Sequence, residues 1–340
     1  LGRALKFFLL LPQLLMRKPN RGGLRGQQAV TARFNDWEGG KGRLIKSWRE
    51  DRRRAVGRDV RVRSRRSQET TTEAKVTGAL RAMSMGLVGK SARMLASKGV
   101  GDLSDPQVRA QLAEKHPARG LPVPPVCGPE QGFVVAGFAG VHMEHRISAM
   151  ADMLRRLRPM VHPGPMGMRN EYLRWLSQGH GSLSAWEQGL HVQGDPTAGE
   201  ALGELSKFME AYLFGRLPGW FYRCWGALEL VALVKGEPAH GETPQVRPIG
   251  MGDSLRKVFH FHAFDANKQA MQAHLEPFNV VLAEDGAAKL VHGVRMTQEL
   301  HPHFVIMELD VKNAFQCLSR SVLLDRIGDV PALAHMKHFL

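Results

Sequence analysis

Apolar residues recur at helical spacing along most of the chain. Helices are predicted over residues 5–15, 86–98, 105–112, 170–176, 200–214, 255–275 and 321–327, with a last helix starting at 332. One further helix carries its apolar residues on a single face, which consists of Ile147, Met150, Met153, Leu154 and Leu157. Gly99 closes the second of these helices, as glycine commonly does at a helix C-terminus.

Three short apolar runs predict strands. Leu228–Val234 and Gln245–Ile249 flank a polar loop rich in Gly and Pro, so we expect a hairpin with a long tip. Residues 304–311 alternate, which predicts a strand with Glu308 and Asp310 on one face and apolar side chains on the other. Strands mixed with helices predict the α+β class, with α/β as the alternative.

Prolines and glycines mark one turn and one boundary. Residues 163–167, PGPMG, form a compulsory turn because two prolines and two glycines permit no regular structure. The Pro-rich stretch 117–129 is the best candidate linker. We therefore predict two parts, residues 1–120 and residues 121–340.

Charge separates the same two parts. Residues 1–120 hold 27 Lys and Arg against 10 Asp and Glu, a net charge of +17, whereas the remaining 220 residues hold 20 basic and 22 acidic groups, a net charge of −2. Such an asymmetry is typical of a basic arm on a nearly neutral folded domain, and it favours a polyanionic partner. Hydrophobic residues make up 43% of the chain, enough for a sizeable core.

The densest charge lies in residues 41–66, where arginines accompany Trp48. Phosphate contacts plus stacking suit single-stranded nucleic acid, and a solvated tract or a nuclear address is the alternative interpretation. The arginines predicted to bind nucleic acid here are Arg52, Arg53, Arg54, Arg61, Arg63, Arg65 and Arg66.

Other features narrow the class of protein. Cys127, Cys224 and Cys317 are isolated from one another and from metal-spaced histidines, so a zinc site or disulfide framework is not expected. The apolar stretch 5–15 is shorter than the roughly 20 residues of a membrane span, and we expect a buried amphipathic helix. We expect an intracellular location and no membrane partner, and the basic composition points to the nucleus.

Asp310 is the strongest candidate for chemistry. A carboxylate at the end of an apolar strand is costly unless a charged group meets it. Mg²⁺, or Mn²⁺, would meet that need, since it takes hard oxygen ligands such as this carboxylate and the Val311 carbonyl. A helix cap or a salt bridge is the alternative role for Asp310.

The segment LDVKNAF, residues 309–315, resembles the first palm motif of reverse transcriptases. The resemblance implies that Asp310 is catalytic and binds the metal ions together with Val311. It also implies that Phe315 discriminates deoxyribose from ribose in the incoming nucleotide.

Upstream segments resemble the same family in the same order. Residues 161–176 resemble a segment with a PGPDG turn, with Met166 at the aspartate, which removes a capping carboxylate. The hairpin LVALVKGE…VRPIG resembles the family's fingers hairpin, which implies that Lys235 and Arg247 hold the triphosphate of a dNTP. An Arg fork and a mobile Lys suit phosphate oxygens, although ordinary solvation of a hairpin is the alternative.

Two weaker matches follow the hairpin. MGDSLRKVFH resembles the next helix of the family, with Arg256 and Lys257 in its basic, nucleic-acid-binding positions. Residues 284–295 resemble the segment near the template groove, with Ala288 where the family often has an acidic residue. The resemblance covers residues 145–335, extends weakly to 85–116, and is closest to the reverse transcriptases of non-LTR retrotransposons.

The resemblance implies a fold and a function. Residues 1–120 would be a basic linker, partly helical or disordered, and residues 121–340 the fingers and the start of the palm of a right-hand polymerase. The intact enzyme would be an RNA-directed DNA polymerase using an RNA template, a DNA primer and dNTPs. Two-metal catalysis needs a second carboxylate source, and no Asp-Asp pair occurs in the 340 residues. We therefore expect this chain to be inactive alone, with a non-catalytic RNA-binding remnant or a decayed element as alternatives.

Overall fold

The structure is a computed structural model that describes residues 2–16, 23–38, 42–46, 48–50, 72–115, 143–178, 180, 196–236, 242–311, 314 and 318–334. The predicted boundary at 117–129, the arginines of residues 52–66, the hairpin tip and Phe315 lie outside these residues. The chain divides into two compact units, which are described separately.

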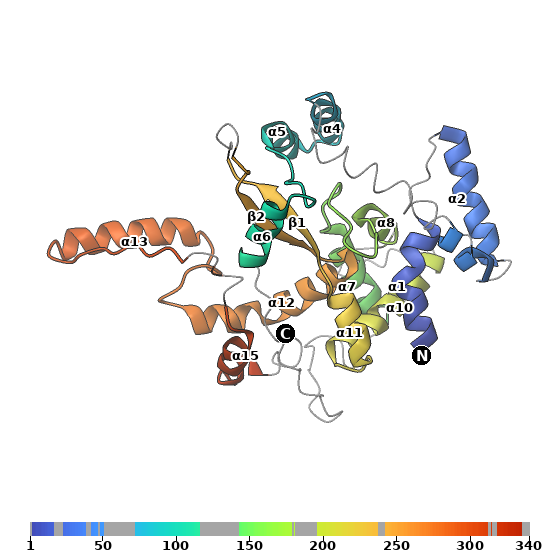
Figure 1. Ribbon diagram of the computed structural model, residues 1–340. Helices are drawn as coiled ribbons and strands as arrows, with labels where there is room; N and C mark the ends of the chain where they lie inside the picture. The colour runs from blue at the N-terminus through green and yellow to red at the C-terminus, as the bar shows by residue number, and fades with distance from the viewer. Residues whose placement is uncertain are drawn as a thin grey trace. The chain divides into compact units, whose positions relative to one another are not determined.

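The first unit is built from the ranges Leu1–Ala118, Leu157–Leu173 and Gly219–Arg256. Its elements are α1 (Gly2–Leu15), α2 (Gly23–Glu38), α4 (Thr72–Ser84), α5 (Val88–Ala96), α6 (Pro106–Lys115), most of α8 (Asn170–Trp175), α11 (Gly219–Gly226), β1 (Glu229–Val234), β2 (Val246–Met251) and the start of α12 (Ser254–Leu275) (Figure 1). Among the described residues, β1 and β2 form the only sheet, and they pair antiparallel.

The apolar face of α1 forms a hydrophobic cluster in this unit. α1 buries Leu14 and Leu15 against Leu44, with Phe7 and Trp37 beside them, where the two rings stack at 5.0 Å between centroids. The prediction of a buried amphipathic helix over residues 5–15 is therefore confirmed. No described helix is both long and apolar enough to cross a membrane.

The second unit is built from the ranges Arg119–Arg156, Arg174–Pro218 and Lys257–Leu340. It contains α7 (Met143–Arg155), α10 (Pro196–Leu213), most of α12, α13 (Gly286–Leu300) and α15 (Arg320–Gly328). α7 packs on α10, and the predicted apolar face of α7 is buried at Met150, Met153 and Leu154. Phe259 of α12 meets Phe208 and Tyr212 of α10, each at 5.8 Å between ring centroids.

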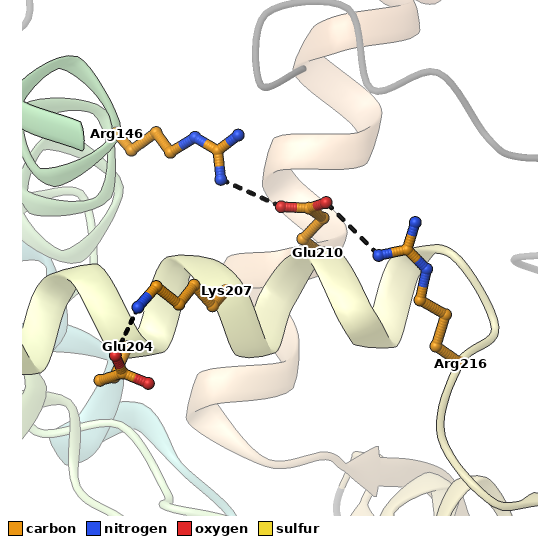
Figure 2. Close-up of polar contacts among 5 residues, drawn as sticks. All are labelled: Arg146, Glu204, Lys207, Glu210 and Arg216. Atoms are coloured by element: carbon orange, nitrogen blue, oxygen red, sulfur yellow. Dashed lines mark hydrogen bonds and ion pairs between the residues drawn. The ribbon is translucent and has the colours of Figure 1, made fainter. Parts of the chain in front are cut away.

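An ion pair joins α7 to α10 beside this core. The Arg146 guanidinium donates to Glu210 Oε2 at 3.0 Å, and Arg216 Nη1 lies 3.6 Å from the other carboxylate oxygen (Figure 2). Glu210 thus meets one arginine that is mostly buried and one that is mostly exposed. A second ion pair, Lys207 with Glu204, lies along the exposed face of α10 (Figure 2).

The structure confirms the α+β class and most of the predicted helices. The helices α2, α4, α11 and α13 had no counterpart in the prediction, because glycine interrupts the pattern within α2, α4 and α13 and α11 spans only eight residues. The predicted strand at 304–311 is wrong, since these residues form no strand. A strand needs a neighbour to satisfy its backbone groups, and in the described part of the chain the only paired strands are β1 and β2.

Candidate functional site

The hairpin of β1 and β2 has two unlike faces. Its inner face carries Ala232 and Val246, both fully buried, which pack against Val108 and Leu112 of α6. Because side chains alternate along a strand, the outer face receives Leu233 and its register partner Arg247, and both are exposed. The burial of one face therefore determines which side chains the hairpin presents to solvent.

Lys235 and Arg247 lie on that outer face. The backbone N–H of Lys235 donates to the Gln245 carbonyl at 2.7 Å, which continues the ladder one pair beyond β1. Lys235 and Arg247 are then diagonal neighbours, about 7–8 Å apart in an antiparallel pair. Both side chains are exposed, so the structure brings together the two cations that the resemblance assigns to the triphosphate of a nucleotide.

The hairpin is held on the side opposite these cations and along one edge. In α6, Lys115 donates to the Val246 carbonyl at 2.7 Å, and Gln111 accepts the Val246 N–H at 3.1 Å. Along the free edge of β1, Gly101 donates to the Ala232 carbonyl at 2.8 Å and Gly99 accepts from Val234 at 3.2 Å. A Cβ on Gly101 would stand 2.9 Å from Val246, so glycine permits this close approach.

The PGPMG turn docks on the backbone that joins β2 to α12. Gly164 has φ +79°, and a Cβ there would lie 2.6 Å from the Gly252 carbonyl oxygen. The Met166 N–H donates to the buried Asp253 carboxylate at 3.3 Å, and Gln13 of α1 donates to the Pro165 carbonyl at 2.8 Å. Asp253 therefore supplies an acceptor from another part of the chain, where the family resemblance had suggested a lost carboxylate at 166.

The backbone before this turn is clamped from two sides. Met160 has φ 57°, in the left-handed region. Its N–H donates to Glu171 at 2.7 Å, and its carbonyl accepts from Lys90 of α5. Burial lowers the pKa of Lys90, with Arg93 adding to this effect and Glu171 opposing it.

Arg256 and Lys257 lie at the start of α12. Arg256 donates to the Trp225 carbonyl at 3.1 Å, at the end of α11, and its guanidinium also lies close to Gly226 and Gly252. Cations commonly satisfy the last carbonyls of a helix in this way. The structure thus gives Arg256 a structural contact, and its predicted contact with nucleic acid stays a prediction.

Asp310 and Val311 lie in the second unit, in the segment that forms no strand. Both are exposed, as are Val305, Met307 and Leu309 beside them. Their carboxylate and carbonyl oxygens are the donor types that Mg²⁺ takes. Among the described residues no three His, Cys, Asp or Glu side chains gather closely enough to hold a metal ion, so the donors fit such a site only in part.

Two residues that bond the PGPMG turn, Asp253 and Gln13, were not predicted from the sequence. Asp253 is 2% exposed, and its position two residues before the helix predicted at 255–275 was the available signal, since aspartate is a favoured residue at a helix N-terminus. Gln13 had no such signal, because its partner Pro165 is 152 residues away.

A scan against protein-family models, a search of curated proteins and a search of solved structures found no match to this chain.

Proposed function

We propose that the hairpin binds the triphosphate of a nucleotide, within the fingers of an RNA-directed DNA polymerase of the non-LTR retrotransposon type. The observation that carries the proposal is the placement of Lys235 and Arg247 on one open face of an antiparallel hairpin. The order of the resembling motifs, the PGPMG turn, the hairpin and then LDVKNAF, supports it.

The chemistry of this face suits phosphate. Arg247 offers a planar fork of donors, and Lys235 adds a mobile ammonium near the hairpin tip. The opposite face packs on Val108 and Leu112 of α6, and Lys115 and Gln111 bond the backbone of Val246. Binding would therefore need no rearrangement of the hairpin core, which keeps the entropic cost of association low.

Asp310 and Val311 are the metal ligands in this proposal. Asp310 and the Val311 carbonyl would hold Mg²⁺ or Mn²⁺, and the metal would stabilise charge on the attacking and leaving oxygens of nucleotidyl transfer. Phe315 would contact the sugar, and Lys257 the nucleic acid. The chain has no Asp-Asp pair in its 340 residues, so nucleotide binding is the appropriate measurement on this chain.

The test is titration of the chain with a dNTP in the presence of Mg²⁺. Arg247→Ala and Lys235→Ala should each weaken binding by roughly 10-fold or more, because each removes a charge-assisted hydrogen bond. Arg247→Lys should recover only part of the loss, since it lacks the fork. Lys207→Ala, which removes an exposed cation of α10, serves as the control. Affinities of R247A and K235A within twofold of wild type would contradict the proposal.

A second candidate function is RNA binding without catalysis. The net charge of +17 in residues 1–120 favours it. Affinity for RNA should then fall steeply with salt, and Asp310→Ala should leave it unchanged. Loss of the affinity on deletion of residues 41–66 would assign it to the basic arm.

A further inference from the structure

The outer face of α12 displays aromatic rings between two lysines. Lys257, Phe261, Phe264 and Lys268 follow one another at spacings of four, three and four residues. At 100° per residue these four positions fall within about 60° around the helix axis. We call them the α12 stripe, and all four belong to the second unit.

The stripe lies on the more exposed side of α12. The packed side carries Val258, Phe259 and Ala263, all fully buried, and Phe259 meets the rings of Phe208 and Tyr212 in α10. By contrast, Phe261 is 49% exposed and Phe264 is 38% exposed. Two partly exposed phenylalanines on the same stripe of one helix leave apolar surface in water, which is unfavourable, and their exposed area takes no part in the core of this unit.

The charges around the stripe are positive in sum. Lys257 is half-buried and Lys268 is exposed. The acidic neighbour on the helix, Asp265, pairs with Arg156 of the second unit. On the other flank His260 bonds to the Tyr212 hydroxyl at 3.2 Å and stacks on its ring. Two lysines therefore bring positive charge to the stripe, and the carboxylate of Asp265 beside them is paired with Arg156.

We propose that the α12 stripe is a stacking platform for single-stranded nucleic acid, with bases on Phe261 and Phe264 and phosphates on Lys257 and Lys268. Alternating aromatic and basic side chains are the combination that single strands require, because every base has a π-face and every linkage a negative charge. The inference rests on the proposed function and deepens it, since it names a surface for the strand that such a polymerase handles.

The experiment measures binding of the full chain to a fluorescent single-stranded RNA and to a strand of equal length with abasic sites. Phe261→Leu with Phe264→Leu keeps apolar surface but removes both rings. This variant should bind the base-containing strand roughly 10-fold more weakly and the abasic strand as wild type does. Phe278→Leu, at an exposed phenylalanine outside the stripe, should bind both strands as wild type does.

The lysines are tested through salt dependence. Lys257→Gln with Lys268→Gln should lower affinity for both strands and reduce the slope of log affinity against log salt by about 1.4, since each phosphate contact of a single strand contributes about 0.7. Circular dichroism of each variant tests whether the fold is retained. An unchanged slope, or a leucine variant that binds the base-containing strand as tightly as wild type, overturns the proposal.

Two further measurements separate this inference from its rivals. If the wild-type chain self-associates in sedimentation and Phe261→Ser with Phe264→Ser makes it monomeric, the stripe is a contact between copies and the proposal fails. The leucine variant should bind dNTP normally, and Lys235→Ala with Arg247→Ala should keep base-dependent binding of the strand. If the stripe proposal is wrong, base-dependent strand binding does not respond to the leucine variant. If the hairpin proposal is wrong, dNTP binding does not respond to the hairpin variants.

Discussion

The carboxylate of Asp253 accepts a hydrogen bond from the backbone N–H of Met166 at 3.3 Å, across 87 positions of sequence. Both residues are buried, Asp253 at 2% and Met166 at 6% exposure. The bond ties the PGPMG turn to the residue that precedes α12, and so to the end of the candidate hairpin. A residue remote in sequence thus provides the acceptor that the turn needs.

This bond predicts a coupling between positions 166 and 253. Met166→Asp should destabilise the chain, because it would place a second carboxylate in a buried setting beside the first, at a cost of roughly 1–3 kcal/mol or more. Asp253→Asn should also destabilise it. In the double variant the carboxylate–amide pair should relieve the repulsion, so urea denaturation should show a loss smaller than the sum of the single losses. Strict additivity would show that the two side chains do not interact.

Gly164 should tolerate no side chain. Gly164→Ala adds both a left-handed alanine and a Cβ placed 2.6 Å from the Gly252 carbonyl oxygen, so its cost should exceed the roughly 1 kcal/mol of the conformation alone. Gly86→Ala is the matched control, since Gly86 has φ +73° and a Cβ added there would meet nothing within 4 Å. Thermal denaturation should show the larger loss for G164A. Equal losses would mean that the close approach to Gly252 does not exist.

Glu210 should matter more to stability than Glu204. Glu210→Gln leaves the Arg146 guanidinium, with a side chain only 15% exposed, without its charged partner, and should cost about 1–3 kcal/mol. Glu204→Gln breaks only an exposed pair with Lys207, and should change stability by less than about 0.5 kcal/mol. Urea denaturation of both variants gives the comparison (Figure 2). A loss for E204Q as large as for E210Q would contradict the structure.

His262 should make the second unit sensitive to acid. Burial lowers its pKa from 6.5 to about 4, and nearby Asp265 opposes this only in part. Between pH 6.5 and 4 the unfolded chain takes up a proton that the folded chain does not, so stability is complete above 6.5 and falls by up to about 3 kcal/mol as pH drops through this window.

The measurement for His262 is the free energy of unfolding at several pH values across that window. His262→Leu should flatten the dependence relative to wild type, because the variant has no ring to protonate. The quantity to compare is the difference between the wild-type and H262L curves of stability against pH, because effects of other groups cancel in it. Parallel curves would place His262 in solvent rather than in the packed part of the unit.

Local patterning was enough to predict much of this chain. The apolar face of α7, the long helix α12 and the apolar strand β1 follow from the spacing of their apolar residues, and the buried residues Met150, Leu255 and Ala232 match it. Glycines at turns were predictable for a similar reason, since φ values such as +79° at Gly164 and Gly167 are open mainly to glycine. These features depend on neighbours a few residues away.

Contacts between distant segments could not be predicted in this way. Residues 304–311 have the alternation of a strand, yet they form none, because pairing depends on a partner elsewhere in the chain and not on the segment itself. Asp253 and Gln13 support the PGPMG turn only because folding brings them to it. The composition of the chain set its charge, and the spacing of its apolar residues set most of its helices. Packing against α6 selected the face on which Lys235 and Arg247 lie, since burying one side of a pleated hairpin leaves only the other for a ligand.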